Sequence, residues 1–528
     1  MQTHARLFCV LALLGALAFA SVAGAAPAAA SGDIGYRDFS YAPLGGSPTG
    51  SKPESKLWFN NGWWASMFNP AAREYRIYGL NAATQTWNDT GVAIDPRNSS
   101  RADTLWVPST GKLFVASHKY VSSGSSASAA DSARLYRYSY HAAAGTYSLD
   151  AGFPVQINSA TSETLVIDRD STGTLWATWT QDSHVYVTHT VGGNDAAWAS
   201  PYVLSGAGTS LTSDDISSLI QFGGNKIGVM WSNQTDHKFY FSVHTDGASA
   251  TAWSTSAVPT ASSSDDHINL KADSAGRVYA VVKTSAGTSS PSATPMILLL
   301  VRGVDGTWTT TVVGTAGDNN TRPIVLLDEP HGLVHVFLSC PQPPKTSAQA
   351  GGDICEKTTS LSAPSFAPGI GTTVIREAGS PDMNDASSTK QNVSAATGIV
   401  VLANNATSNT YWHMFESVPG SPPPSAVPPR AKRRLDPHLR ITYKRWRGLR
   451  LHVAGRLAPS ARGRVTVRFV EHLHGKWIRS RRTAKVHRGR FSVVVRLPRR
   501  ARGHRALLRA HYSGDAAYRP QTRKVRLR

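Results

Sequence analysis

The sequence has few cysteines and no long apolar run after its first residues. Only three of its 528 residues are cysteine, at positions 9, 340 and 355. The longest early apolar segment, Leu7–Ala20, has 14 residues, which is shorter than the roughly 18 that a membrane-spanning helix needs. These shortages exclude a disulfide-rich scaffold and predict no transmembrane helix.

The early apolar segment predicts an export signal over residues 1–25. MQTHAR supplies the positive start, and Ala23-Gly24-Ala25 fits the small-residue cleavage rule; an uncleaved anchor is the alternative. We therefore expect a secreted protein, extracellular or cell-wall associated. In an oxidising compartment Cys340 and Cys355 would form a disulfide around residues 341–354. The bridge would either fix the shape of this loop or protect it from proteolysis.

A strand–turn–strand pattern occurs seven times along the chain. The first strands are expected to start near Leu57, Thr104, Leu165, Ile216, Ile268, Pro323 and Asn392. Each is followed by a turn, usually with Gly, and a second apolar run such as GTLWATW (173–179) or GRVYAVV (276–282). Repeats of this size with several β-patterned segments are typical of a β-propeller.

In the other repeats, a small residue followed by an aromatic residue, such as Thr86-Trp87, precedes the outer strand. The last repeat ends near Val418 without such a pair. Its fourth strand is therefore missing, and IGYRDFSYA (34–42) is expected to replace it and close the ring. We predict a seven-bladed propeller over residues 33–418. Six blades with one degenerate repeat is the alternative.

Acidic residues almost disappear after the propeller. A Pro-rich basic linker over 419–434 leads to a segment in which residues 430–528 hold 31 Lys and Arg against three acids, a net charge of +28. Because the whole chain carries +21, residues 1–429 carry −7. The chain therefore joins a mildly acidic domain to a strongly basic one.

The basic segment also has strand patterns, including RVTVRFVE (464–471), GRFSVVVRL (489–497) and HRALLRAHY (504–512). About seven such strands suit a small sandwich. With the ending SGDAAYRPQ (513–521), residues 435–528 resemble bacterial immunoglobulin-like domains. That resemblance implies a spacer, adhesive or wall-proximal module. The fold class is therefore all-β: a propeller closed by an N-terminal strand, plus an Ig-like sandwich.

The charge of the basic domain predicts an anionic partner. Clustered cations attract polyanions through counterion release, so we expect an anionic cell-wall polymer as partner; an inert spacer is the alternative. No recognition motif for sequence-specific nucleic-acid binding is present. We expect a monomer without a membrane span.

In the propeller, segments entering the first strands and those joining second to third strands should share one face. Polar residues at these positions are the ligand-binding candidates, and the opposite face, with its Gly turns, is expected to be structural. The candidates are Arg101, Asp103, His118, Glu163, Asp214, Asp215, Asp236, His237, Asp265, Asp266, His267 and Arg322.

Two functions fit these candidate residues. A binding module would hold glycan hydroxyls, with Trp63 and Trp64 near enough to stack on sugars. A glycosidase would use opposed carboxylates among Glu163, Asp215 and Asp266 as acid and base. The histidines would shuttle protons or hold a metal ion, although no cofactor is predicted because the spacings match no zinc signature. Many of these acids would alternatively cap turns.

The repeats resemble sialidase-type propellers of secreted bacterial proteins. DSTGTLW (170–176), DSAGRVY (273–279) and VDGTW (304–308) are similar to the Asp-box turn of that family, but none matches it fully. The Arg-Ile-Pro element is missing, so no catalytic residue is assigned. We expect a secreted carbohydrate- or cell-surface-binding propeller with a basic adhesion domain; an extracellular glycan-cleaving enzyme is the alternative.

Overall fold

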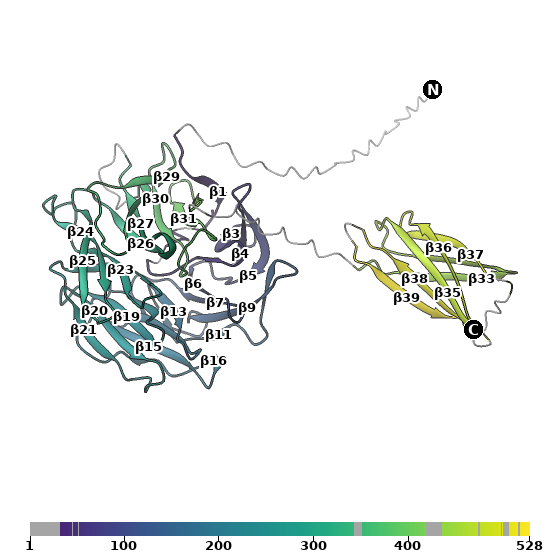
Figure 1. The fold of residues 1–528 in the computed structure, drawn as a ribbon, viewed down its shortest axis with the longest axis horizontal. Helices are drawn as coiled ribbons and strands as arrows, with labels where there is room; N and C mark the ends of the chain where they lie inside the picture. The colour runs from purple at the N-terminus through teal and green to yellow at the C-terminus, as the bar shows by residue number, and fades with distance from the viewer. Residues whose placement is uncertain are drawn as a thin grey trace, which may run out of the picture. The chain divides into compact units, whose positions relative to one another are not determined.

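The computed structural model describes residues 32–44, 46–50, 52–342, 351–418, 436–473, 476–497, 499, 506–515 and 518–527. The chain divides into two compact units, residues 1–429 and 430–528 (Figure 1). The predicted export signal and the linker over 419–434 lie outside the described residues. Among the helices of the described residues, none has the length and apolar character needed to cross a membrane.

In the described part of the first unit, seven antiparallel sheets of four or five strands follow one another along the chain. In Figure 1 they surround a common centre, an arrangement consistent with a β-propeller. From the centre outward, the first three sheets are β2 (Leu57–Phe59), β3 (Trp63–Asn69), β4 (Glu74–Asn81), β5 (Thr86–Ala93); β6 (Ser100–Val107), β7 (Lys112–Lys119), β9 (Arg134–His141), β10 (Thr146–Leu149), with β11 (Val155–Gln156) beside β9; and β13 (Leu165–Arg169), β14 (Leu175–Gln181), β15 (His184–Val191), β16 (Asn194–Trp198), with β17 (Tyr202–Val203) beside β15.

The next three sheets repeat the pattern, and three short elements lie between the strands of the sheets. The sheets are β18 (Ser217–Phe222), β19 (Lys226–Asn233), β20 (Lys238–Thr245), β21 (Ser254–Val258); β22 (Ser264–Ala272), β23 (Val278–Thr284), β24 (Pro295–Arg302), β25 (Trp308–Thr315); and β26 (Thr321–Asp328), β27 (Leu333–Cys340), β28 (Asp353–Ser360), β29 (Thr372–Ile375). The short elements are the pair β8 (Ser125–Ser126) and β12 (Ala160–Thr161), and the 3₁₀ turn η1 (Glu329–His331).

The seventh sheet joins the two ends of the unit. It contains β30 (Met383–Ser387), β31 (Ile399–Asn405), β32 (Thr410–Glu416) and the N-terminal strand β1 (Tyr36–Ser40), which pairs with β32. The prediction that the N-terminal strand supplies the missing fourth strand is therefore confirmed. The predicted first strand near Asn392 is wrong, because the inner strand of this sheet begins at Met383 and ends before that residue. The sequence of β30 is mostly short and polar, so it lacks the apolar pattern that marks a buried strand.

Apolar side chains of successive sheets pack against one another to form the core. Phe222 and Met230 of one sheet pack with Ile268 and Leu270 of the next. Each such side chain contributes roughly 1.5–3 kcal/mol on burial. Trp63 and Trp64, proposed as sugar platforms, are buried in this core. That expectation is wrong, since β3 is a second strand covered on both faces.

The disulfide Cys340–Cys355 is present and links β27 to β28, with Cα atoms 5.8 Å apart. Cys355 lies within the third strand of its sheet, opposite Leu338, and not in the connecting loop.

The second unit is a pair of antiparallel sheets around one apolar core. Alternate residues face inward, as Val465, Val467 and Phe469 do, while their neighbours face solvent. The sheets are β33 (Arg440–Arg447), β34 (Arg450–Arg456), β37 (Arg490–Arg496); and β36 (Lys476–Lys485), β35 (Arg464–Leu473), β38 (Leu507–Tyr512), β39 (Gln521–Arg526).

Candidate functional site

Four carboxylates and a histidine meet where three neighbouring inner strands begin. Glu163 precedes β13, Asp214 precedes β18, and Asp265, Asp266 and His267 lie at the start of β22. One oxygen each of Glu163, Asp214 and Asp266 lie within 4.8 Å of one another, as do one ligand atom each of Asp265, Asp266 and His267. We call these five residues the acidic cluster. The structure thus brings together five of the twelve predicted ligand residues.

Lys52 reaches the acidic cluster from the segment before β2. Its Nζ lies 2.9 Å from Glu163 Oε1 and forms an ion pair with Asp266, and the side chain is only 12% exposed. Its φ of 41° lies in the left-handed region that side-chain-bearing residues seldom adopt. A second lysine, Lys283, pairs with Asp265. Two ammonium groups therefore neutralise much of the charge of the acidic cluster.

The carboxyls of the acidic cluster differ in proton affinity. Burial raises the pKa of Glu163, and Lys52 offsets this only in part. Burial also acts to raise the pKa of Asp266, but His267 and Lys52 outweigh it and hold that pKa well below its usual range. Glu163 Oε2 and His267 Nε2 are buried without a hydrogen-bond partner among the described residues. The pKa values of Glu163 and Asp266 are thus displaced in opposite directions.

The acidic cluster offers the oxygen and nitrogen ligands that divalent cations accept. However, the Lys52 ammonium contacts both Glu163 and Asp266, which is where a cation would bind. A metal ion would have to displace this ammonium. The residues present therefore fit an internal ion-pair network better than a metal centre.

The two predicted arginines have separate neighbours. The Arg101 guanidinium lies 4.9 Å from the centre of the Tyr120 ring, and its Nε is buried without a hydrogen-bond partner among the described residues. Tyr120 also interacts electrostatically with Glu163, which places Arg101 near the acidic cluster. Arg322 Nε lies 3.0 Å from Asp385 Oδ1.

Asp103 and His118 connect neighbouring sheets inside the protein. Asp103 accepts hydrogen bonds from the backbone N–H groups of Ser55 and Ile167, at 2.9 and 2.8 Å. His118 is fully buried, with Nε2 2.6 Å from Glu54 Oε1. Both side chains are fully buried, so neither is part of an exposed ligand-binding face.

The remaining predicted residues lie in turns. Asp215 accepts hydrogen bonds from the Thr212 N–H at 2.8 Å and the Ser232 hydroxyl at 2.8 Å, so it caps its own turn. Asp236 and His237 lie in the exposed turn between β19 and β20. Asp215 thus fits the turn-capping alternative, while Asp236 accepts a hydrogen bond from the Tyr240 hydroxyl at 2.9 Å.

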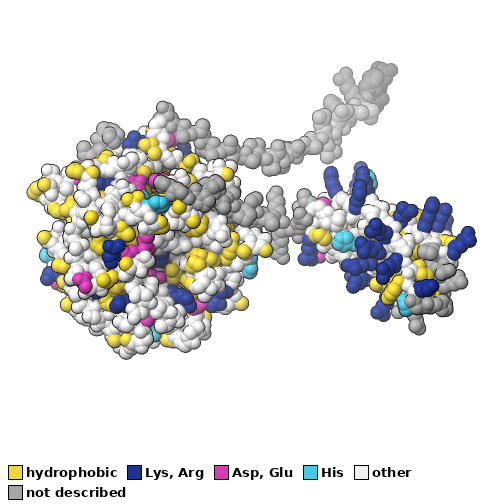
Figure 2. Space-filling model, in the orientation of Figure 1, with side chains coloured by type: hydrophobic (Ala, Val, Ile, Leu, Met, Phe, Trp, Pro, Cys, Tyr) yellow, Lys and Arg dark blue, Asp and Glu magenta, His cyan; other side chains and the backbone are white. Residues whose placement is uncertain are grey.

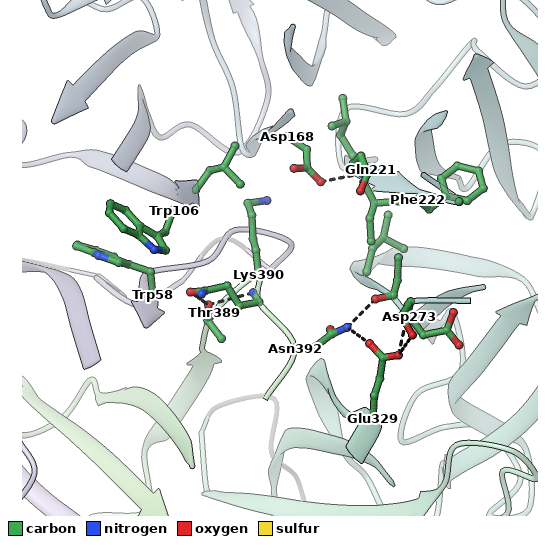
Figure 3. A pocket seen from close by; sticks show the side chains of 18 of the residues that line it. Trp58, Trp106, Asp168, Gln221, Phe222, Asp273, Glu329, Thr389, Lys390 and Asn392 are labelled. Atoms are coloured by element: carbon green, nitrogen blue, oxygen red, sulfur yellow. Dashed lines mark hydrogen bonds between the residues drawn. The ribbon is translucent and has the colours of Figure 1, made fainter. Parts of the chain in front are cut away.

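A cavity of about 410 Å³ lies at the opposite ends of the same inner strands (Figure 3). Gln221 and Phe222 reach it at the end of β18, and Asp273 reaches it after β22. Trp58 and Trp106 form another part of its wall. The face that was expected to be structural thus contains a cavity.

Charged and amide groups face this cavity. Asp168 accepts a hydrogen bond from the backbone N–H of Gln221 at 2.7 Å, and Lys390 Nζ lies 3.0 Å from Asp103 Oδ2. Asn392 Nδ2 donates to Glu329 Oε1 at 2.7 Å. In Figure 3, Asp168 and Lys390 point toward the open centre. The cavity therefore combines an anion, a cation and amides with aromatic walls.

A buried lysine lies near these charged groups. Lys271 of β22 is 3% exposed, and burial followed by repulsion from Lys390 lowers its pKa to about 7, although Asp103 and Asp168 oppose this. Burial also raises the pKa of Asp168. The centre of the unit thus holds alternating acidic and basic groups that depend on one another for compensation.

Sequence reasoning missed the cavity for an identifiable reason. The predicted first strand near Asn392 puts this segment at the start of an inner strand, whereas Lys390 and Asn392 follow β30. Starting the seventh inner strand at Met383 would have placed both residues at the Gly-turn face.

No family model and no curated protein matches this chain. Among solved structures, it is similar to a fungal alcohol oxidase of the AA5 family in complex with copper (13% identity, 92% of this chain and 100% of that chain, TM-score 0.41). It is also similar to a mutant of AofleA from Arthrobotrys oligospora (8%, 62% and 87%, 0.39) and to the polysaccharide lyase Uly1 (8%, 90% and 95%, 0.37). At these identities and TM-scores, the likenesses support no argument about activity.

Proposed function

We propose that this chain is a secreted binding protein, in which a seven-bladed propeller binds a carbohydrate or cell-surface glycan and a basic Ig-like sandwich adheres to an anionic cell-wall polymer. The observation that carries the proposal is the cavity of Figure 3. Its volume of about 410 Å³ is in the range of small-ligand sites, which combine apolar walls with a few placed polar groups.

The polar groups of the cavity suit a polyhydroxylated ligand. Asp168 provides acceptors, Lys390 provides donors, and the Gln221 amide provides both. Trp58 and Trp106 are 1% and 8% exposed, so they shape the wall and offer little area for stacking. Recognition would therefore depend on hydrogen bonds to hydroxyl groups.

The test is glycan binding by the full chain. A glycan array would identify the best oligosaccharide, and calorimetric titration with it would then compare the wild type with Lys390→Ala. We expect at least about tenfold weaker binding of the variant, as for loss of one charge-assisted hydrogen bond. Lys238→Ala is the matched control, because Lys238 is an exposed lysine at the start of β20. Equal binding by both variants, or no bound glycan, would contradict the proposal.

Glycan cleavage is the second candidate, and one observation favours it. Glu163 and Asp266 have pKa values displaced in opposite directions, as a general acid and its partner carboxylate require. Incubating the full chain with plant and bacterial wall polysaccharides would release reducing sugars if this candidate is right, and Glu163→Gln would abolish the release. Binding without products would exclude it.

A further inference from the structure

Four cations form a row across the larger sheet of the second unit. Arg468 of β35 lies opposite Arg481 of β36 on one side and Arg509 of β38 on the other, and Arg509 lies opposite Lys524 of β39. All four side chains are exposed. We call Arg481, Arg468, Arg509 and Lys524 the cation row. With strands about 4.8 Å apart, it extends over roughly 14 Å.

The cation row has no internal compensation. Within the described part of the chain, none of its four side chains forms an ion pair or a hydrogen bond; the acid Asp436 pairs elsewhere, with Arg519. Like charges placed directly opposite one another destabilise a sheet. The fold therefore keeps an unfavourable arrangement that a bound polyanion would relieve.

A groove of about 420 Å³ runs along the cation row. Its lining includes all four row residues, Arg479, and the side chains of Val470 and Leu507. Phe469 is the only aromatic residue among the described lining residues, and it is fully buried. The groove thus has charged walls and a partly apolar floor. The exposed ring of Trp477 is not part of its lining and lies beside it, 5.9 Å from the Arg479 guanidinium. In Figure 2, Lys and Arg cover much of the visible face of this unit.

We propose that the cation row is the binding site for a linear phosphodiester polymer, held through its backbone phosphates. This inference rests on the proposed adhesive function of the second unit and names its site and ligand. Arginine, which supplies three of the four cations, presents a planar fork that matches phosphate oxygens in pairs. A single-stranded nucleic acid is less suited, because such sites stack successive bases on rings along the groove, whereas the exposed Trp477 ring lies outside the groove lining.

The experiment measures binding of fluorescent poly(glycerol phosphate) to the full chain from roughly 50 to 300 mM NaCl. The row variant is Arg468→Gln with Arg509→Gln. The control is Arg440→Gln with Arg490→Gln, which removes the same charge from exposed positions of the smaller sheet. We expect the row variant to bind at least about tenfold more weakly, with a log–log salt slope lower by about two. The control should stay within about twofold of wild type. Calorimetry would check that neither variant unfolds at a lower temperature than the wild type.

The other outcomes distinguish failure of the proposed site from failure of the adhesive function. Equal losses in both variants would mean diffuse attraction and would overturn the site, leaving the adhesive function intact. No binding of poly(glycerol phosphate) or of polygalacturonate by the wild type at roughly 50 mM salt would overturn the adhesive function itself. Tighter binding of an oligothymidylate or of polygalacturonate, at matched charge, would overturn the phosphodiester assignment.

Discussion

The two units handle charge in opposite ways. In the first unit, cations are buried against acids: Lys52 bridges Glu163 and Asp266, and Lys56 lies 2.6 Å from Glu54. In the second unit, the four cations of the cation row face solvent and have no acid beside them among the described residues. The first arrangement ties elements of the chain together, while the second leaves charge available for a partner.

This difference determines what a charged residue contributes to the stability of each unit. A buried ion pair replaces lost hydration, so removing one member leaves an uncompensated charge and destabilises the fold. An exposed row of like charges already opposes folding, so removing one member should be harmless or stabilising. Substituting a cation should therefore have opposite effects on the stability of the two units.

The largest effect is expected from Lys52→Met. The variant leaves Glu163 and Asp266 buried without their cation, so the free energy of unfolding of the first unit should fall by about 3–5 kcal/mol. Urea denaturation followed by tryptophan fluorescence would measure it. The loss should shrink as the pH is lowered and the carboxyls protonate. A change no larger than that of the exposed-site variant Lys238→Met would show that the acidic cluster does not need its lysine.

The second effect is an acid-dependent loss of stability through Glu54. Burial acts to raise its pKa, but Lys56 and His118 lower it to about 2, against 4.5 for the free side chain. Because the folded pKa is lower, the stabilisation is present above about pH 4.5 and is lost as the pH falls toward 2. It amounts to about 3 kcal/mol.

Urea titrations of the wild type and of Glu54→Gln across that pH range would measure the contribution. The gap between their free energies of unfolding should narrow as the solution becomes more acidic. A constant gap would mean that Glu54 does not titrate in this way.

The smallest effect is expected in the second unit, and it has the opposite sign. Arg468→Glu places a carboxylate between Arg481 and Arg509, so the unit should become more stable by about 0.5–1 kcal/mol at low salt. The gain should disappear near 1 M salt. Thr466→Glu, on the same strand but opposite Thr483 and His511, controls for the added negative charge alone. A destabilising Arg468→Glu would mean that Arg468 has a structural role.

Much of this architecture could be predicted because it depends on local patterns. Gly turns followed by apolar runs indicated the second strands. The absence of an outer strand in the last repeat correctly predicted that the N-terminal strand β1 joins the last sheet. Residues at the starts of inner strands were expected to share one face, and the structure brings Glu163, Asp214 and Asp266 together there. The central lysine was not predicted, because Lys52 lies in an irregular segment that no repeat register describes.

Burial and register limited the rest of the prediction. His118 and Asp103 have the residue types of a ligand site, but only the structure shows them enclosed between sheets. The cavity depends on where β30 ends, and the polar residues of that strand resemble a loop in sequence. The cation row depends on cross-strand register, which the strand patterns alone did not specify.

Calorimetry of the full chain at low and high salt tests the central contrast most directly. Lys52→Met would identify the transition of the first unit, because it should shift that transition alone. Raising NaCl from roughly 20 mM to about 1 M screens exposed like charges far more than buried pairs. The second unit should therefore unfold several degrees higher at high salt, while the first unit changes little. Equal shifts, or a second unit that is indifferent to salt, would contradict the account.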